Sequence, residues 1–257
     1  MKAAGWIAAA AGAVLVIVLL LGSRGPYPGP AESEKVSTYP APQVSAESVQ
    51  REAERITVRV RSRRCQGLFA GSGVIRGEQV ITNRHVIGGS REIEINTWDG
   101  SSFRARPPFE VTDRMDIGRF SFPGDPANTV TAEERPDAGE ELLLAGYPRG
   151  QRLAVVEGKL SGYADGMELR NLRFDADVMI IEASIWRGDS GGPVLNTQGE
   201  LVGIIYAGSF DEKKKKKTDR SETAFVIPID EVDKLTPEDW RPVQPCQQPD
   251  PASLRIG

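Results

Sequence analysis

Hydrophobic and polar positions alternate in short stretches over much of the chain after residue 55. The clearest stretches are residues 56–60, 92–96 and 118–122, and further short apolar runs follow them, most of them separated by turns that contain glycine. Alternation with a period of two predicts half-buried strands, and many short strands joined by close turns are typical of a β-barrel or a β-sandwich. The pattern therefore predicts an all-β protein with one late helix over residues 230–235.

The chain before this region has a different pattern. Residues 3–22 are uncharged and mostly apolar, and a helix of this length spans about 30 Å, enough to cross a bilayer. A cleaved signal peptide is the alternative, although the end of the run offers a poor cleavage site. Residues 23–50 contain five prolines and no hydrophobic periodicity, which indicates an extended linker. We predict a transmembrane signal anchor over 1–22, this linker, a folded domain over 51–240 and a C-terminal tail over 241–257.

Composition narrows the possible functions. The 257 residues are 39% hydrophobic and 26% charged, which excludes a disordered chain, a fibrous repeat and a polytopic membrane protein. The pI near 5.3 provides no cationic field for nucleic acid. Two cysteines are too few for a thiolate zinc site, and we expect no metal, nucleotide or organic cofactor. There is one histidine, His85, so any imidazole chemistry must take place there.

Three segments offer complementary chemistry. His85 follows a predicted strand, Asp116 precedes another, and Ser190 lies in the glycine-rich segment 188–193. A serine hydroxyl needs an adjacent base to become a nucleophile, and the base needs a carboxylate to fix its tautomer. Asp113 is a rival for the carboxylate, but Asp116 leads directly into an alternating strand. These residues predict nucleophilic catalysis by serine.

The segment 188–193, Gly-Asp-Ser-Gly-Gly-Pro, resembles the nucleophile motif of the chymotrypsin-like serine proteases without a mismatch. The order His85, Asp116, Ser190 is also that family's order. The spacings of 31 and 74 residues between them are similar to those of the bacterial Deg/HtrA branch. The resemblance runs from about residue 52 to residue 235, and we expect no PDZ domain after it. It implies two antiparallel β-barrels, a catalytic triad of these three residues, and an oxyanion hole formed by the N–H groups of Gly188 and Ser190.

The resemblance also assigns a role to Asp189, that of a structural carboxylate which receives a positive group and sets the oxyanion loop. The cation would be a new N-terminus produced by cleavage near Ile56, or a basic side chain such as Arg187. Members of the HtrA branch often carry asparagine here, so Asp189 departs from that branch and leaves constitutive activity open.

The resemblance to the chymotrypsin-like family also implies which residues select the substrate. Ser184 occupies the floor of the pocket for the residue before the scissile bond (P1), and the walls are assigned to Tyr206, Ala207, Gly208 and Ala224. None of these side chains carries a negative charge, so cleavage after lysine or arginine has no electrostatic driver. A small or medium apolar P1 residue is expected.

Certain actinobacterial membrane-anchored periplasmic proteases look similar around Cys65, and this implies a disulfide between Cys65 and Cys246. A bridge requires an exported domain, which places the N-terminus inside and the catalytic domain outside the cytoplasm.

We therefore predict a single-pass, membrane-tethered serine endopeptidase that acts on protein or peptide substrates. The alternative is a catalytically silent or latent tethered domain that acts as a binding or sensing module. The sequence does not indicate an oligomeric state.

Overall fold

The computed structural model describes residues 45–165, 168–169, 172–173, 176–208 and 219–247. The predicted membrane anchor, most of the predicted linker, and residues 248–257 of the predicted tail lie outside these residues. Within the described ranges, no helix is long and apolar enough to cross a membrane.

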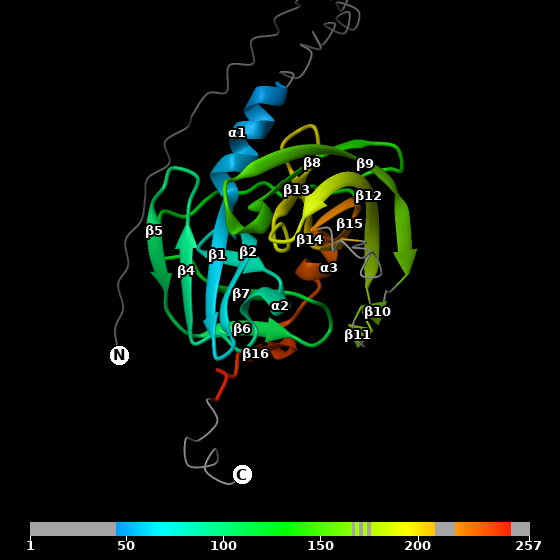
Figure 1. Ribbon diagram of the computed structural model, residues 1–257. Coiled ribbons are helices and arrows are strands. Elements are labelled where there is room, and N and C mark those ends of the chain that lie inside the picture. Colours follow the sequence, from blue (N-terminus) through cyan, green and yellow to red (C-terminus); the bar gives the residue numbers. More distant parts are fainter. Residues whose placement is uncertain (1–44, 166–167, 170–171, 174–175, 209–218, 248–257) are drawn as a thin grey trace, which may run out of the picture. The chain divides into compact units, whose positions relative to one another are not determined.

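Eight antiparallel strands form the first sheet, on the left in Figure 1. In spatial order they are β16 (Trp240–Pro242), β6 (Phe109–Thr112), β7 (Gly118–Ser121), β3 (Gln79–Thr82), β2 (Gly67–Arg76), β1 (Thr57–Arg64), β4 (Glu92–Asn96) and β5 (Ser102–Ala105). The sheet is not closed by main-chain pairing, since β16 and β5 are its two edges. β6 uses its outer edge to pair with β16 from the C-terminal segment, so that edge is not available to β5.

Six strands form a closed barrel, on the right in Figure 1. Around the barrel they are β12 (Asp177–Trp186), β15 (Arg220–Pro228), β14 (Leu201–Gly208), β13 (Pro193–Leu195), β8 (Glu141–Gly146) and β9 (Ala154–Asp165). Its interior is a separate apolar cluster that includes Leu142, Leu144, Leu160, Met179, Ile181 and Val226. A two-stranded ribbon, β10 (Glu168–Leu169) and β11 (Leu172–Arg173), makes a further small sheet.

The predicted all-β class is confirmed, and one of the two predicted barrels is closed. The other predicted barrel is found as a half-barrel, because the first sheet ends at β16 on one side and at β5 on the other. The late helix α3 (Ile229–Asp233) begins one residue before the predicted one and ends two residues earlier.

Two helices were not predicted. One is the four-residue helix α2 (Arg84–Ile87), and the other is α1 (Ala46–Ile56), which begins inside the predicted linker. Ser45 caps it by accepting a hydrogen bond from the Ser48 N–H at 3.2 Å, as N-cap serines do. Val49, Ala53 and Ile56 are buried. Their i, i+4, i+7 spacing places them on one face of a helix, which packs against β8 and β13.

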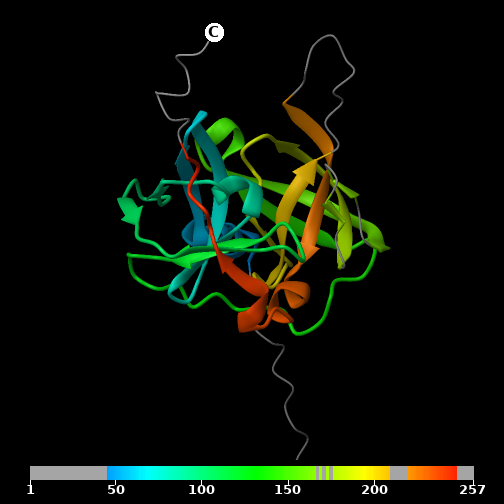
Figure 2. The ribbon, with the colours of Figure 1, turned by 90° about the horizontal axis from the view of Figure 1, so that it is seen from below.

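The C-terminal segment crosses the first sheet, as Figure 2 shows from below. The short turn η2 (Pro237–Asp239) leads into β16, which pairs with β6, and Val243 N–H donates to the Phe109 carbonyl at 2.7 Å. The other short turn, η1 (Pro148–Gly150), lies between β8 and β9. Cys246 then forms a disulfide with Cys65, with the two Cα atoms 5.8 Å apart. The segment therefore links the turn between β1 and β2 to the loop after α2 (Arg84–Ile87), because the Cys246 N–H donates to the Gly89 carbonyl at 3.1 Å.

Candidate active site

His85 lies in the four-residue helix α2, which begins immediately after β3. The Asn83 side-chain amide donates to the Asp116 carbonyl at 2.9 Å, and the Arg84 N–H donates to the same carbonyl at 3.3 Å. Asn83 is fully buried. These bonds join the start of α2 to the loop before β7 and so fix the distance between the two catalytic segments.

The structure brings Asp116 against the imidazole of His85. One carboxylate oxygen of Asp116 accepts the His85 backbone N–H at 2.9 Å, and the other is hydrogen-bonded to His85 Nδ1. The Asp116 side chain is only 4% exposed, whereas the His85 side chain is 44% exposed. A buried carboxylate on Nδ1 fixes the tautomer that leaves Nε2 as a base.

Asp113 lies outside this arrangement. Its carboxylate is ion-paired with Arg84 at 2.6 Å and with Arg241 of β16, and its side chain is mostly exposed. Arg241, through its hydrogen bond, and Arg84 hold the pKa of Asp113 below its usual range. Asp113 thus connects α2 to the C-terminal segment, and Asp116 is the carboxylate that faces the histidine.

Ser190 lies in a turn whose backbone conformation requires glycine at positions 188 and 191. Gly191 has a φ of +91°, and a Cβ atom there would lie 2.1 Å from the Ser72 carbonyl oxygen. Gly188 has a φ of +107°, and its Cβ would lie 2.5 Å from the Tyr147 carbonyl oxygen. Both glycines are therefore required by backbone conformation and by space.

The N–H groups of Gly188 and Ser190 have no hydrogen-bond partner in the described part of the chain, whereas Asp189 N–H and Gly191 N–H donate to Trp186 and Ile205 carbonyls at 3.1 and 2.6 Å. Two N–H groups without a protein acceptor, on either side of Asp189, are the donors that an oxyanion needs. The Ser190 hydroxyl donates to the Tyr206 carbonyl oxygen at 3.5 Å. It makes no hydrogen bond to His85 in the structure, so the nucleophile and the base are not yet engaged. Catalytic hydrogen bonds are often loose before substrate binds.

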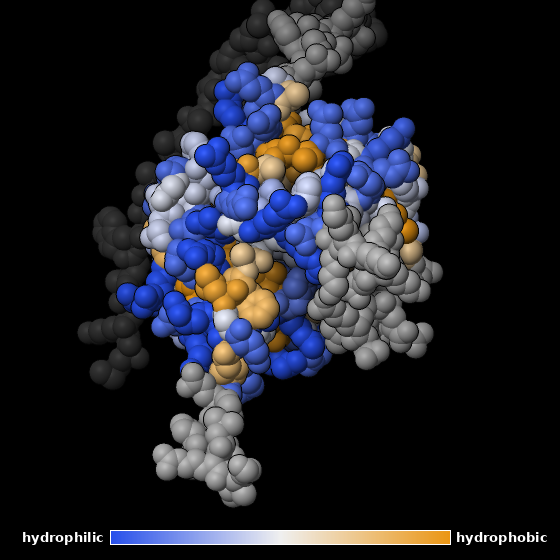
Figure 3. Space-filling view, in the orientation of Figure 1, coloured by the Kyte–Doolittle hydropathy of each residue, from blue (hydrophilic) through white to orange (hydrophobic). Residues whose placement is uncertain are grey.

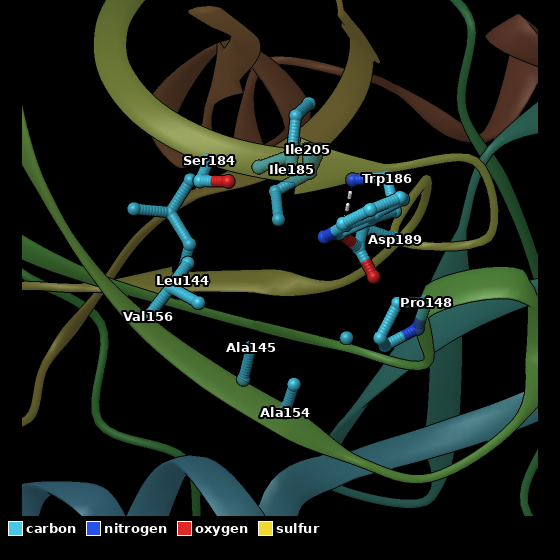
Figure 4. A pocket seen from close by; sticks show the side chains of 11 residues that line it. Leu144, Ala145, Pro148, Ala154, Val156, Ser184, Ile185, Trp186, Asp189 and Ile205 are labelled. Carbon is cyan, nitrogen blue, oxygen red and sulfur yellow. Dashed lines mark hydrogen bonds between the residues drawn. The ribbon is translucent and has the colours of Figure 1, made fainter. Parts of the chain in front are cut away.

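Asp189 is buried beside a small cavity of about 50 Å³ inside the closed barrel. Figure 4 shows its carboxylate at the edge of a group of apolar side chains that includes Leu144, Val156 and Ile205. One oxygen accepts the Trp186 N–H at 2.7 Å, while the other has no partner among the described residues. Burial raises the pKa of Asp189 to about 6.

Neither of the expected cations neutralises Asp189. Within the described residues Asp189 has no ion pair, and Arg187 pairs instead with Asp219 at 3.7 Å. Ile56 is fully buried at the end of α1, in continuous chain with β1. The carboxylate that was expected to receive a positive charge therefore faces an apolar cavity.

The five proposed pocket residues lie in different surroundings. Ser184 lines the cavity beside Asp189, and its hydroxyl accepts a hydrogen bond from Arg220 Nε at 2.7 Å. Ala224 is buried in the barrel core, and Ala207 and Tyr206 are buried in the apolar cluster that includes the first sheet. Gly208 ends β14 and is partly exposed.

Sequence reasoning missed Ser72, which is fully buried in β2. Its N–H donates to the Ser190 carbonyl at 2.8 Å, and its hydroxyl donates to the Gly188 carbonyl at 2.7 Å. The same hydroxyl accepts the Tyr147 N–H at 2.8 Å. The only signal was its position between two glycines, Gly71 and Gly73, which allows close backbone approach.

This fold and this site define a class. The sequence model of the trypsin-like peptidase domain matches residues 71–204, just over half of the chain, and the chain belongs to that family. The family resemblance found in the sequence is therefore confirmed, and with it the serine peptidase class.

Individual relatives agree with this assignment. The chain is 29% identical over 193 residues to the serine protease Rv3671c of Mycobacterium tuberculosis, covering 69% of this chain and 44% of that protein. It is 31% identical over 169 residues to the serine endoprotease DegS of Escherichia coli, covering 64% and 46%. The chain thus spans less than half the length of these relatives.

Solved structures support the fold. The active form of the Rv3671c protease has a TM-score of 0.63 at 24% identity, covering 90% of this chain and 97% of that one. The HtrA-type protease AlgW, solved with a tripeptide, has a TM-score of 0.60 at 23% identity, covering 72% and 60%.

Proposed function

We propose that this chain is a membrane-tethered serine endopeptidase whose catalytic domain lies outside the cytoplasm. The observation that carries the catalytic part is the buried Asp116 carboxylate on Nδ1 of the only histidine, in a fold where the N–H groups of Gly188 and Ser190 have no acceptor among the described residues. The tether rests on the apolar run 3–22, and the location rests on the disulfide, since such bonds persist in oxidising compartments.

The chemistry follows from the positions of these groups. Rotation of the Ser190 side chain away from the Tyr206 carbonyl directs its oxygen to His85 Nε2, which takes the proton as the oxygen attacks a peptide carbonyl. The negative charge on the former carbonyl oxygen is held by the N–H groups of Gly188 and Ser190. His85 returns the proton to the leaving amine, and water then hydrolyses the acyl-enzyme by the same route.

A fluorophosphonate probe and a peptide substrate test the assignment. We expect Ser190→Ala to abolish labelling, and we expect His85→Ala, Asp116→Asn and Ser190→Ala each to reduce peptide cleavage by about 10⁴-fold or more, because triad members act as a unit. Asp113→Asn is the matched control and should keep wild-type cleavage. A damaging Asp113→Asn beside a harmless Asp116→Asn would refute the assignment of the acid.

We propose a small or medium apolar P1 preference, as inferred from the alignment. Ser184 is the candidate floor residue, and Arg220 already donates to its hydroxyl, so a cationic P1 side chain would meet a positive charge there. A dehydrated cation without a carboxylate costs several kcal/mol. A peptide-library profile dominated by Arg or Lys at P1 would refute this substrate class.

A second candidate is a latent form of the same domain. The Ser190 hydroxyl donates to Tyr206 rather than to His85, and Asp189 has no ion pair within the described residues. A full chain that fails to react with the probe until it is cleaved or bound would support latency. N-terminal sequencing and the mass of membrane-isolated protein would distinguish an anchor from a cleaved signal peptide.

A further inference from the structure

Arg64 is the last residue of β1, and its guanidinium has different partners from those of the other arginines near the end of that strand. Arg61 and Arg63 form ion pairs with Glu94 and Glu92 across the β1–β4 ladder, at 3.4 and 3.5 Å. No carboxylate lies within 4.0 Å of the Arg64 guanidinium in the described part of the chain. Instead its Nη2 donates to the carbonyl oxygens of His85 and Val86, the latter at 2.6 Å.

These two carbonyls need a donor because α2 ends directly after them. The last carbonyls of a helix have no partner inside it, and Gly89, with a φ of +74°, turns the chain away. No backbone N–H of the described residues reaches either the His85 or the Val86 carbonyl. The Val86 carbonyl also accepts the Ser62 hydroxyl at 2.7 Å. The His85 carbonyl is capped by the Arg64 side chain, which thus acts as a C-terminal cap of α2.

The guanidinium is fixed in this position from several sides. The ring of Phe69 covers it, with 4.3 Å between Arg64 Cζ and the ring centroid. Leu68 and Phe69 in β2 are exposed large apolar side chains, and Figure 3 shows apolar surface gathered over this part of the first sheet. The next residue, Cys65, is bonded to Cys246. Burial lowers the pKa of Arg64, yet an arginine starts so far above neutrality that the group stays charged.

We propose that Arg64 is a positioning residue for the catalytic imidazole. It holds the carbonyl of His85 while Asp116 holds the N–H and Nδ1 of the same residue, so the backbone and the ring are fixed from opposite sides. Without Arg64 the His85 carbonyl loses its cap, and the backbone that carries the imidazole is less firmly fixed. The inference rests on the proposed peptidase function for its kinetic consequence and on geometry alone for its structural one.

The test compares Arg64→Gln with Arg63→Gln in the full chain in detergent. Arg63 is the adjacent residue, is largely exposed and is paired with Glu92, so its loss should leave kcat within about twofold. For Arg64→Gln we expect kcat to fall about tenfold to a hundredfold, as small misplacements of catalytic groups do, with KM unchanged. Arg64→Lys keeps the charge but loses the planar stacking on Phe69, and its kcat should lie between the two.

A readout without activity uses the single histidine. Selective ¹³C labelling of histidine in tag-free protein reports His85 alone. We expect its ring signals to shift and broaden in Arg64→Gln and to stay unchanged in Arg63→Gln, with the thermal unfolding of both variants still cooperative. If the wild-type protein does not cleave peptides, the proposed function fails and these ring signals alone decide the role of Arg64.

Three results would overturn the inference. They are a folded Arg64→Gln variant with wild-type kcat and unchanged ring signals, a loss confined to KM, and an equal loss in Arg63→Gln. If Arg64→Gln does not fold, Arg64→Lys decides, and a wild-type kcat together with wild-type ring signals in that variant would also overturn it.

Discussion

Replacing Asp189 by asparagine is expected to stabilise the protein at alkaline pH and to have no effect at acid pH. Asp189 is 7% exposed as a residue, and its carboxylate faces an apolar cavity with one oxygen that has no partner in the described chain. Asparagine has the same shape, and its oxygen can still accept the Trp186 N–H that Asp189 accepts at 2.7 Å. The substitution therefore removes the charge and keeps the hydrogen bond.

The magnitude follows from the pKa. Burial raises the pKa of Asp189 from its ordinary value of 3.8 to about 6. At about 1.4 kcal/mol for each tenfold change in proton affinity, ionising the folded protein costs about 3 kcal/mol more than ionising the unfolded chain. The folded state binds the extra proton between these two values, so stability is full below about pH 4 and is lost as pH rises through 6. Above about pH 7 the free energies of unfolding of the wild type and of Asp189→Asn should differ by this whole amount.

Thermal unfolding of the full chain in detergent at pH 4, 6 and 8 measures this difference. We expect Asp189→Asn to raise Tm by about 6–12 °C at pH 8, since about 1 kcal/mol corresponds to about 2–4 °C for a domain of this size. At pH 4 the two proteins should unfold together. Asp113→Asn is the control, because the pKa of Asp113 is lowered, and it should not stabilise the protein at pH 8. An Asp189→Asn variant less stable than wild type at pH 8 would show that a cation neutralises this carboxylate, and the reasoning from burial would be wrong.

Two further predictions concern stability. Gly191→Ala should destabilise the fold by more than about 3 kcal/mol in urea unfolding, because its Cβ would overlap a backbone carbonyl of β2. Gly100→Ala, also at positive φ but with no atom near the new Cβ, should cost only about 1 kcal/mol, and equal costs would refute the steric argument. Cys65→Ser should lower stability by about 5 kcal/mol, since the bridge spans a sequence separation of 181 residues. Native protein with two reactive thiols would contradict the bridge with Cys246.

β4 and β7 were predictable because more and less buried residues alternate along them. β4 was expected over 92–96 and is found there, and β7 differs from its prediction by one residue. α1 was missed because its apolar spacing overlaps the end of a proline-rich stretch whose composition indicates a linker. The open first sheet was not predictable either, since it depends on β16 from the C-terminal segment taking the outer edge of β6.

The site was predictable where its chemistry depends on residues that are adjacent in the sequence. The segment around Ser190 has a fixed glycine pattern because the backbone allows nothing else at Gly188 and Gly191. His85 was identified because the chain has no other histidine. Ser72 was not identifiable, because its hydroxyl acts on a carbonyl 116 residues away, and nothing in a local pattern reports such a contact.

Ser72 also explains how the two sheets are held in register at the nucleophile. Its N–H holds the Ser190 carbonyl, its hydroxyl orients the Gly188 carbonyl, and its own carbonyl accepts the Thr82 hydroxyl at 2.6 Å. Thr82 ends β3, directly before the segment that carries His85. Ser72 is thus hydrogen-bonded to the turn that carries the oxyanion-hole donors and also to β3, the strand that precedes His85. Buried polar groups of this kind are costly to leave unsatisfied, so the spacing between base and nucleophile depends on the first sheet as much as on the glycine motif.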